Sequence, residues 1–354
     1  MKLINKLLGI SKEELMMSKP RILSVDLGYS SIKVASYNAD GVLQLDKYIS
    51  ACAKIDNPLD PGEDDTIFPF LDSYYILGPA ALKVPQSYLL PLTTIEELLE
   101  VYPVWIAWLI RKYGGVENIT AVGLGLSMAW SGYSETLIQK LYDTLMITKS
   151  GFFYCMPQGL SCKKIYQDYG LDLREDSKRN DYKMKNYLIA DGGYNSVDVC
   201  NVLNGKAAAG AAIGIPNTGL INVSRRIVEY LQDNYNLNIS LKEAQTIVDT
   251  KGLFQKRGKK YDISEAVDNC LVDYLEMILN MIESRFGDSL DQIEGILVAG
   301  GLSYFFKYYL EEKKDPRVIE LVEKHFPISF IHMPVTDCEY MNAIAYLKIL
   351  EEKL

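Results

Sequence analysis

Two nine-residue stretches of the chain repeat the same polar residues around a glycine turn. They read DLGYSSIKV at residues 26–34 and DGGYNSVDV at residues 191–199, and five of the nine positions are identical. In each stretch an Asp ends an apolar run, and a Gly lets the backbone approach a ligand closely. Consecutive backbone N–H groups in a tight turn form an anion-binding nest. Two such turns facing each other predict a binding site for a polyphosphate, in which carboxylate, water and phosphate oxygens hold Mg²⁺.

Side chains in the two turns would strengthen the binding of the polyphosphate. Ser30 and Ser31 in the first turn offer hydrogen-bond donors, and Lys33 offers a cation. Asn195 and Ser196 take the places of the two serines in the second turn. A single turn with Asp and Gly is common in hairpins, so the prediction depends on the repetition. The chain has no G-x-x-x-x-G-K-[ST] stretch, which excludes a P-loop nucleotide site.

The elements around the two turns repeat as well. Each turn lies between short apolar runs typical of strands, a third strand follows, and helical patterns come next. The strands are predicted at residues 21–26, 31–37 and 40–48, and again at 187–191, 196–203 and 207–215. Strands alternating with helices indicate an α/β fold with a partly parallel sheet. The repeat is a duplicated domain, because solenoid repeats have periods of about 20–50 residues.

The segment between the first three strands and the next helix has a different character. Residues 50–92 are rich in Pro, Asp and Gly, and we expect irregular loops with one or two short strands there. A helix should follow, with Thr94 as its N-cap and Glu97 completing a capping box.

A charged break, LDLREDSKRNDYKMKN at residues 171–186, separates the two copies. Its composition fits a solvated loop, and it also lies where a domain boundary is expected. The length suits two units. We predict lobe I from residues 21–186 together with 328–354, and lobe II from residues 187–327. Residues 1–20 form an N-terminal extension.

The composition excludes several classes of function. The 354 residues carry a formal net charge of −9, which argues against direct binding of nucleic acid because that needs a basic face. Two histidines, His325 and His332, cannot form a histidine-rich metal site, and the six cysteines show no C-x-x-C spacing. Free buried thiols are typical of a reducing cytoplasm, where we expect the protein. No apolar run reaches the ~18 residues of a membrane span.

The sequence resembles the actin-like ATPase superfamily. VDLGYSSIKV and IADGGYNSVDV, followed by ILVAGG, are similar to the two phosphate motifs and the adenosine motif of that family. The finer resemblance is to the ParM-type actins of bacteria and archaea, which form plasmid-segregating filaments. It is carried by GLGLSMAWSGY, CMPQGLSCKKIY, the stretch from GKKYD to ILVAGG, and EYMNAIAYLKI. It covers nearly the whole chain from Arg21 and implies an actin-like fold, two duplicated ribonuclease-H-like lobes around a nucleotide cleft.

The resemblance implies roles for the two turns. Asp26 would hold Mg²⁺ through water, and Asp191 would be the second carboxylate near the metal. The first turn would meet the β-phosphate, and the second would cradle the γ-phosphate. The implied residues are Gly28, Ser30, Ser31 and the cation Lys33 in the first turn, and Gly192, Gly193 and Asn195 in the second.

Further residues are implied around the nucleoside. Backbone at glycines would lie against ribose and adenine, and the residues concerned are Gly214, Gly300 and Gly301, with Leu302 after them. Lys242 and Glu243, in SLKEAQ, fall where the family contacts the base or ribose, although a solvated helix face explains them equally well.

The turns depart from many relatives in one respect. Tyr29 and Tyr194 stand where many relatives have a small residue. Both belong to the implied nucleotide site, and their bulky side chains must point away from the phosphates.

Gln158, in MPQG, occupies the place where the family carries the Glu or Gln that orients the attacking water. Phosphoryl transfer depends on positioning and electrostatics more than on a strong base. The resemblance therefore implies Gln158 and Asp191 as the catalytic residues. A Gln at the start of a helix is otherwise unremarkable.

The implied function is an ATPase that polymerises with ATP and disassembles after hydrolysis to ADP and phosphate. ATP or ADP and Mg²⁺ would be the cofactors. The protein itself would be the first partner, in a filament. A basic DNA-binding adaptor would connect the filament to plasmid DNA.

Two other functions stay open. Apolar residues of the N-terminal extension cluster on one side of a helix, which suits a membrane-associated scaffold of the MreB type with residues 1–18 as an interfacial anchor. The other is a small-molecule kinase of the same fold. It would need a carboxylate base in the cleft, and the sequence indicates none beyond Asp26 and Asp191.

Overall fold

The computed structural model describes residues 21–56, 67–172 and 183–354. Within them the chain forms two five-stranded sheets, ordered β3-β2-β1-β7-β8 and β11-β10-β9-β14-β15. In each sheet the first three strands pair antiparallel and the last two join in parallel. The first sheet contains β1 (Ile22–Leu27), β2 (Ser31–Tyr37), β3 (Leu43–Ile49), β7 (Ala121–Leu126) and β8 (Phe153–Pro157). The second contains β9 (Tyr187–Gly192), β10 (Ser196–Leu203), β11 (Lys206–Pro216), β14 (Ile296–Ala299) and β15 (Ile331–His332). The predicted duplication is confirmed.

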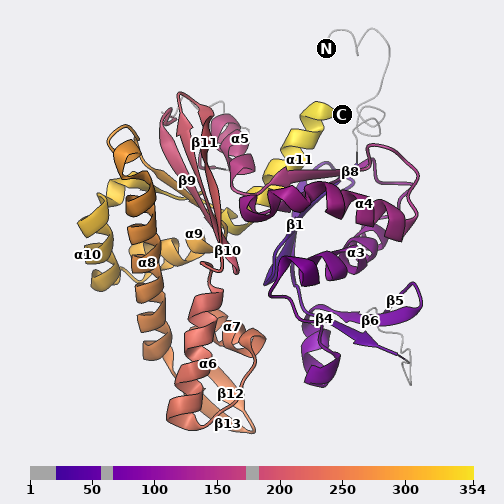
Figure 1. The fold of residues 1–354 in the computed structure, drawn as a ribbon, viewed down its shortest axis with the longest axis horizontal. Helices are drawn as coiled ribbons and strands as arrows, with labels where there is room; N and C mark the ends of the chain where they lie inside the picture. The colour runs from indigo at the N-terminus through magenta and orange to yellow at the C-terminus, as the bar shows by residue number, and fades with distance from the viewer. Residues whose placement is uncertain (1–20, 57–66, 173–182) are drawn as a thin grey trace.

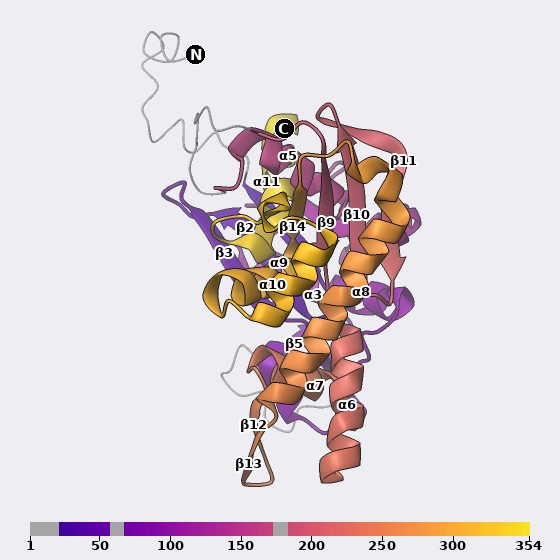
Figure 2. The same ribbon diagram turned by 90° about the vertical axis from the view of Figure 1, so that its left-hand side faces the viewer.

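Helices cover both sheets and fill the space between them (Figures 1 and 2). On the first sheet, α3 (Ile95–Lys112) and α4 (Ser134–Leu145) build one apolar core. A second core lies on the second sheet and is built by α6 (Ile221–Tyr235), α7 (Leu241–Asp249), α8 (Ser264–Leu290), α9 (Gly300–Lys307) and α10 (Pro316–His325). A third core joins the sheets through α5 (Leu160–Tyr169) and α11 (Met341–Lys353). The two sheets, each with its own apolar core, therefore share a helical layer.

Helix α3 starts as its sequence predicts. Thr94 Oγ1 accepts a hydrogen bond from the Glu97 N–H at 3.3 Å, and Glu97 Oε2 accepts from the Thr94 N–H at 3.0 Å. Glu97 also accepts from the N–H of Thr93 at 2.7 Å. This capping box fixes the entry into α3 and with it the carbonyl of Thr93, which accepts a 3.3 Å hydrogen bond from Asn195 of the second turn.

Each sheet carries a smaller unit at its lower end in Figure 1. On the first side, β4 (Cys52–Ile55), β5 (Ile67–Phe70) and β6 (Ser73–Leu77) form a sheet ordered β4-β6-β5. On the second side, β12 (Leu253–Lys256) and β13 (Lys259–Asp262) form a hairpin. The expectation of one or two strands in residues 50–92 was too low, since three short strands there stabilise one another by pairing.

The predicted lobe boundaries stay a prediction. β15 pairs with β14 in the second sheet, whereas α11 packs against β1 and β7 of the first. The N-terminal extension, residues 1–20, lies outside the described residues, as do residues 173–182 of the charged break. No helix in the described ranges is long and apolar enough to cross a membrane.

Candidate functional site

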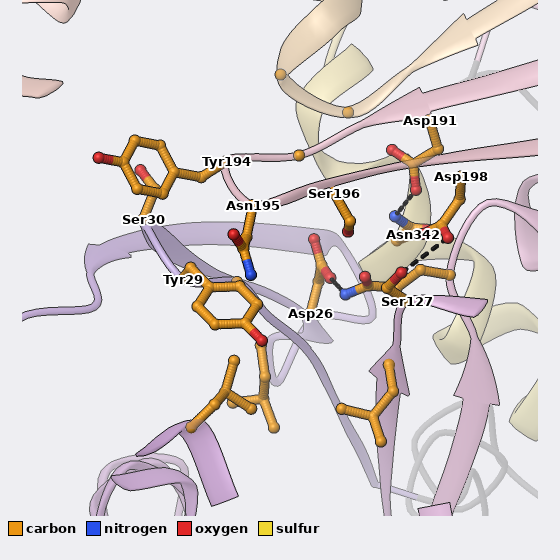
Figure 3. A pocket seen from close by; sticks show the side chains of 18 of the residues that line it. Asp26, Tyr29, Ser30, Ser127, Asp191, Tyr194, Asn195, Ser196, Asp198 and Asn342 are labelled. Carbon is orange, nitrogen blue, oxygen red and sulfur yellow. Dashed lines mark hydrogen bonds between the residues drawn. The ribbon is translucent and has the colours of Figure 1, made fainter. Parts of the chain in front are cut away.

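The two glycine turns meet in one pocket between the sheets (Figure 3). Each turn joins the first two strands of its sheet, and each Asp is the last residue but one of its strand. The pocket brings together most of the predicted site residues. They are Asp26, Gly28, Tyr29, Ser30, Ser31, Lys33, Gln158, Asp191, Gly193, Tyr194, Asn195, Gly300 and Gly301.

Asp26 is held by two side chains. Lys33 Nζ lies 3.5 Å from Asp26 Oδ2, because the two residues are direct partners across β1 and β2. Gln158 Nε2 donates a 2.6 Å hydrogen bond to Asp26 Oδ1. Gln158 directly follows β8, and its own N–H donates to the Leu126 carbonyl at the end of β7 at 2.8 Å. Parallel strands thus bring the predicted metal-side carboxylate and the predicted water-orienting amide to one edge of the first sheet.

Asp191 is buried, and burial raises the pKa of its carboxyl group to about 6. Asn342 Nδ2 donates to Asp191 Oδ2 at 2.6 Å (Figure 3). Asn342 Oδ1 accepts a 3.0 Å hydrogen bond from the N–H of Gly159, the residue after Gln158. One amide therefore links the second carboxylate to the segment that carries Gln158. Sequence reasoning missed Asn342, because only long-range packing brings the start of α11 here.

Asp198 adds a third buried carboxyl group to the pocket beside Asp26 and Asp191. Sequence reasoning missed it. It lies across β9 and β10 from Asp191. Its Oδ1 accepts hydrogen bonds from Ser127 Oγ at 2.8 Å and from the Met128 N–H at 3.0 Å. Burial raises the pKa of Asp198 well above its usual range. The available signal was its place in the repeat, since it is the eighth residue of the second stretch and Lys33 is the eighth of the first.

The charges of the pocket suit a metal–phosphate ligand. Among the described lining residues, Asp26, Asp191 and Asp198 carry carboxyl groups, and Lys33 carries the one amine. A polyphosphate alone would be repelled here, whereas a divalent cation would be attracted. Within the described residues, no group of three or more His, Cys, Asp or Glu side chains could hold a metal. The carboxylates of Asp26 and Asp191 are of the kind that Mg²⁺ uses, since it commonly binds one or two carboxylates and takes its other ligands from phosphates and water.

Close backbone approach is required at two glycines. A Cβ on Gly28 would lie 2.6 Å from the Ser31 carbonyl oxygen inside the first turn. Gly300 has a φ of +65°, and a Cβ there would lie 2.2 Å from Asp191 Oδ1. A side chain at either position would thus disturb a turn or a carboxylate of the pocket.

The two tyrosines of the turns are placed differently. The Tyr29 ring is partly buried against the core of the first sheet, and this burial raises the pKa of its hydroxyl to about 12. Tyr194 is directed toward α7, where its hydroxyl donates to the Leu241 carbonyl at 3.4 Å. In Figure 3 the Tyr194 ring lies on the far side of its turn from Asp191.

The remaining predicted residues do not line the pocket. Gly192 packs closely against α9, because a Cβ there would lie 2.5 Å from the Leu302 Cβ. Gly214 packs against the backbone of Ala129. Glu243 closes a capping box at the start of α7 and pairs with Lys256 at 2.7 Å.

Lys242, the other residue expected at the base or ribose, contacts the first turn. Its Nζ donates to the Ser30 carbonyl at 2.8 Å. The amine therefore lies against the first turn in this structure.

Comparison with known proteins identifies the architecture. Residues 189–312, roughly a third of the chain, match the family model "Archaeal actin homologue MreB-like, C-terminal". A non-polymerisable quadruple mutant of pCBH ParM superposes with a TM-score of 0.70 at 15% identity, over 94% of this chain and 99% of that one. The protein has the actin-like fold.

Two further actin-like structures give the same result. The archaeal actin homologue Ta0583 in complex with ADP has a TM-score of 0.64 at 15% identity, with 94% of this chain and 99% of that one covered. A 15-stranded ParM filament from Clostridium botulinum gives 0.64 at 14% identity, over 95% and 100%. No curated protein matches the sequence. The resemblance to actin-like proteins with ParM among them is confirmed, as is the predicted fold class.

Proposed function

We propose that this actin-like protein binds ATP with Mg²⁺ between its two turns, polymerises in that state and disassembles after hydrolysis. The observation that carries the proposal is the meeting of two duplicated Asp-bearing turns, one from each sheet, in a single pocket. Each turn alone could be an ordinary hairpin, but two facing turns match the two ends of a phosphate chain.

The residues divide into metal, phosphate and nucleoside groups. Asp26 and Asp191 would hold Mg²⁺ with water and phosphate oxygens, and Lys33 would balance the phosphate charge. When bound, the metal would neutralise charge on the phosphates. The phosphates would be contacted by Gly28, Ser30, Ser31, Gly193 and Asn195, and the nucleoside by Gly300 and Gly301.

Gln158 supports the hydrolytic part of the proposal. Its Nε2 donates to Asp26 Oδ1 at 2.6 Å, which fixes the amide plane and leaves Oε1 available to accept from a water. A protein contributes mainly positioning and electrostatic stabilisation to phosphoryl transfer, and orienting the attacking water is part of that positioning. The second catalytic residue would be Asp191, which the bond from Asn342 orients.

Solved structures of similar fold support the proposal that this protein binds nucleotide and self-associates. Bacillus thuringiensis ParM has been solved with AMPPNP and with ADP, and the Clostridium botulinum ParM is a filament. By extension we propose that the protein acts in the cytoplasm. Its filament would position plasmid DNA through a DNA-binding adaptor, because a chain of net charge −9 is poorly suited to grip DNA itself.

Sedimentation tests this function. The purified chain would be incubated with Mg²⁺ and either ATP, ADP or AMPPNP, and then centrifuged. We expect pelleted filaments with AMPPNP and with ATP that is still in excess, and little pellet with ADP. Equal pellets in all three nucleotides and in their absence would contradict nucleotide-driven assembly.

The spacing of apolar residues in the sequence of residues 3–10 supports a second candidate, a membrane-associated scaffold. Its test is sedimentation of the full chain and of a chain lacking residues 1–18 with vesicles containing anionic lipid. Vesicle binding lost on deletion would favour the scaffold, and equal binding of both chains would remove it.

A small-molecule kinase is less well supported. A kinase needs a free carboxylate base beside the phosphates. The structure adds Asp198 to the two aspartates that the sequence indicated. Its Oδ1 already accepts two hydrogen bonds, from Ser127 and Met128. The carboxyl group thus serves the contact between the sheets.

A further inference from the structure

Helix α7, in lobe II, contacts the first glycine turn, in lobe I. This turn carries Ser30 and is called the phosphate turn below. Lys242 Nζ donates to the Ser30 carbonyl at 2.8 Å and to Gln245 Oε1 at 3.0 Å. Gln245 Nε2 in turn donates to Ser30 Oγ. The carbonyl and the hydroxyl of Ser30 are thus both bound by one turn of α7, and the carbonyl also accepts a 3.0 Å hydrogen bond from the Ser50 N–H. In Figure 1, α7 lies on the side of its lobe that faces the first.

The donor pattern leaves Ser30 able to act on a ligand. A serine hydroxyl has one O–H donor and two acceptor lone pairs. Gln245 uses a lone pair, so the Ser30 hydrogen stays available to donate to a phosphate oxygen. Because the amide holds the oxygen in place, the direction of that remaining donor is restricted.

Lys242 is an unusual residue for a structural role alone. Its side chain is partly buried, and this burial lowers the pKa of its amine to about 8, against the opposing effect of the Asp249 carboxylate. No salt bridge involving Lys242 is present in the described ranges. Burying an amine without a salt bridge costs free energy, and the two hydrogen bonds of this amine to described residues go to a carbonyl and an amide oxygen. Lys256, in contrast, forms a salt bridge with the exposed Glu243, the residue that follows Lys242 in α7.

We propose that Lys242 and Gln245 are positioning residues for the phosphate turn. Their hydrogen bonds form only when α7 lies against the turn, and they then fix Ser30 with its hydroxyl hydrogen directed at the nucleotide phosphate. Closure of lobe II and phosphate binding by lobe I are thereby coupled, and by linkage the nucleotide must favour closure as much as closure favours the nucleotide. This inference rests on the proposed nucleotide site and adds to it the residues that connect that site to lobe movement.

The first test needs no nucleotide. Hydrogen–deuterium exchange of the segment 27–33 would be compared in the unmodified chain and in Lys242→Met and Gln245→Leu. We expect faster exchange of this segment in both variants, because α7 no longer holds the turn. Lys260→Met and Gln255→Leu, on the exposed hairpin beside α7, are matched controls and should leave it unchanged. Unchanged exchange in both α7 variants would overturn the proposal.

The second test is a double-mutant cycle on AMPPNP affinity in the presence of Mg²⁺. Loss of a hydrogen bond from a charged donor should weaken binding about 10-fold in Lys242→Met, and loss of a neutral one about 3-fold in Gln245→Leu. If Gln245 acts through Ser30, Gln245→Leu should have no further effect in a Ser30→Ala background. A full additional loss there would contradict the positioning role.

The two tests separate failure of the inference from failure of the function. An unmodified chain that binds no nucleotide would contradict the proposed function, while the exchange experiment would still decide whether α7 holds the turn. Tight nucleotide binding combined with wild-type affinity in both α7 variants would overturn the inference and leave the function standing.

Discussion

Asp191 on β9 lies directly opposite Asp198 on β10, at the register where the first sheet places Asp26 opposite Lys33. The duplicated turns are therefore alike in backbone and opposite in electrostatics. One copy pairs its carboxylate with a cation. The other buries two carboxyl groups side by side, which is destabilising unless one stays protonated or binds a cation.

The burial of Asp191 predicts a pH-dependent cost to stability. The pKa of its carboxyl group is raised from 3.8 to about 6 in the folded chain. Well below pH 4 the carboxyl group is protonated in both the folded and the unfolded chain, so its burial does not lower the free energy of unfolding. Between pH 4 and 6 the unfolded chain loses its proton first, so stability falls by roughly 3 kcal/mol as pH rises.

Asp191→Asn should remove this loss. We expect the variant to equal the unmodified chain in unfolding free energy near pH 4 and to exceed it above pH 6, as measured by urea denaturation without nucleotide. A constant difference across this range would show that the carboxyl group is not buried as described.

Asp198 should be structural in the absence of ligand. Asp198→Ala leaves the Ser127 hydroxyl and the Met128 N–H without their acceptor, at a cost of about 1–3 kcal/mol in unfolding free energy. Asp198→Asn keeps an acceptor oxygen and should cost less. Urea denaturation of the two variants at pH 7 would decide, and an equal loss in both would argue against the hydrogen bonds as the cause.

Gly300 should tolerate no side chain, and Gly258 provides a matched control. Both have positive φ, +65° and +77°, but a Cβ on Gly258 meets nothing within 4 Å, whereas one on Gly300 meets Asp191. Gly258→Ala should cost about 1 kcal/mol from backbone strain alone. Gly300→Ala should cost more and should also abolish binding of Mg²⁺–AMPPNP in a titration calorimeter. Retained binding would contradict the tight contact between Gly300 and the carboxylate.

Much of the fold was predictable because its signals are local. The repeated turns, the strands on either side and the capping box at Thr94 depend on residues within a few positions of one another. The repeat then implied two similar units, and the two sheets have the same order of strands.

The missed parts of the site depend on contacts between distant segments. Asn342 reaches Asp191 across 151 positions of sequence, and Ser127 reaches Asp198 across 71. Asp198 could have been found by comparing the eighth positions of the two stretches and pairing β9 with β10. The position of Lys242 depends on how the two lobes lie against each other, which no local pattern specifies.

In the function proposed above, hydrolysis at the paired turns ends a nucleotide-driven assembly. Light scattering and phosphate release would be followed in one cuvette after mixing the chain with Mg²⁺ and ATP. We expect scattering that rises at once and decays as phosphate appears. In Gln158→Ala, the scattering should rise equally and persist, with phosphate release at least 10-fold slower. Decay of scattering in Gln158→Ala at the unmodified rate, or phosphate release without any scattering in the unmodified chain, would contradict it.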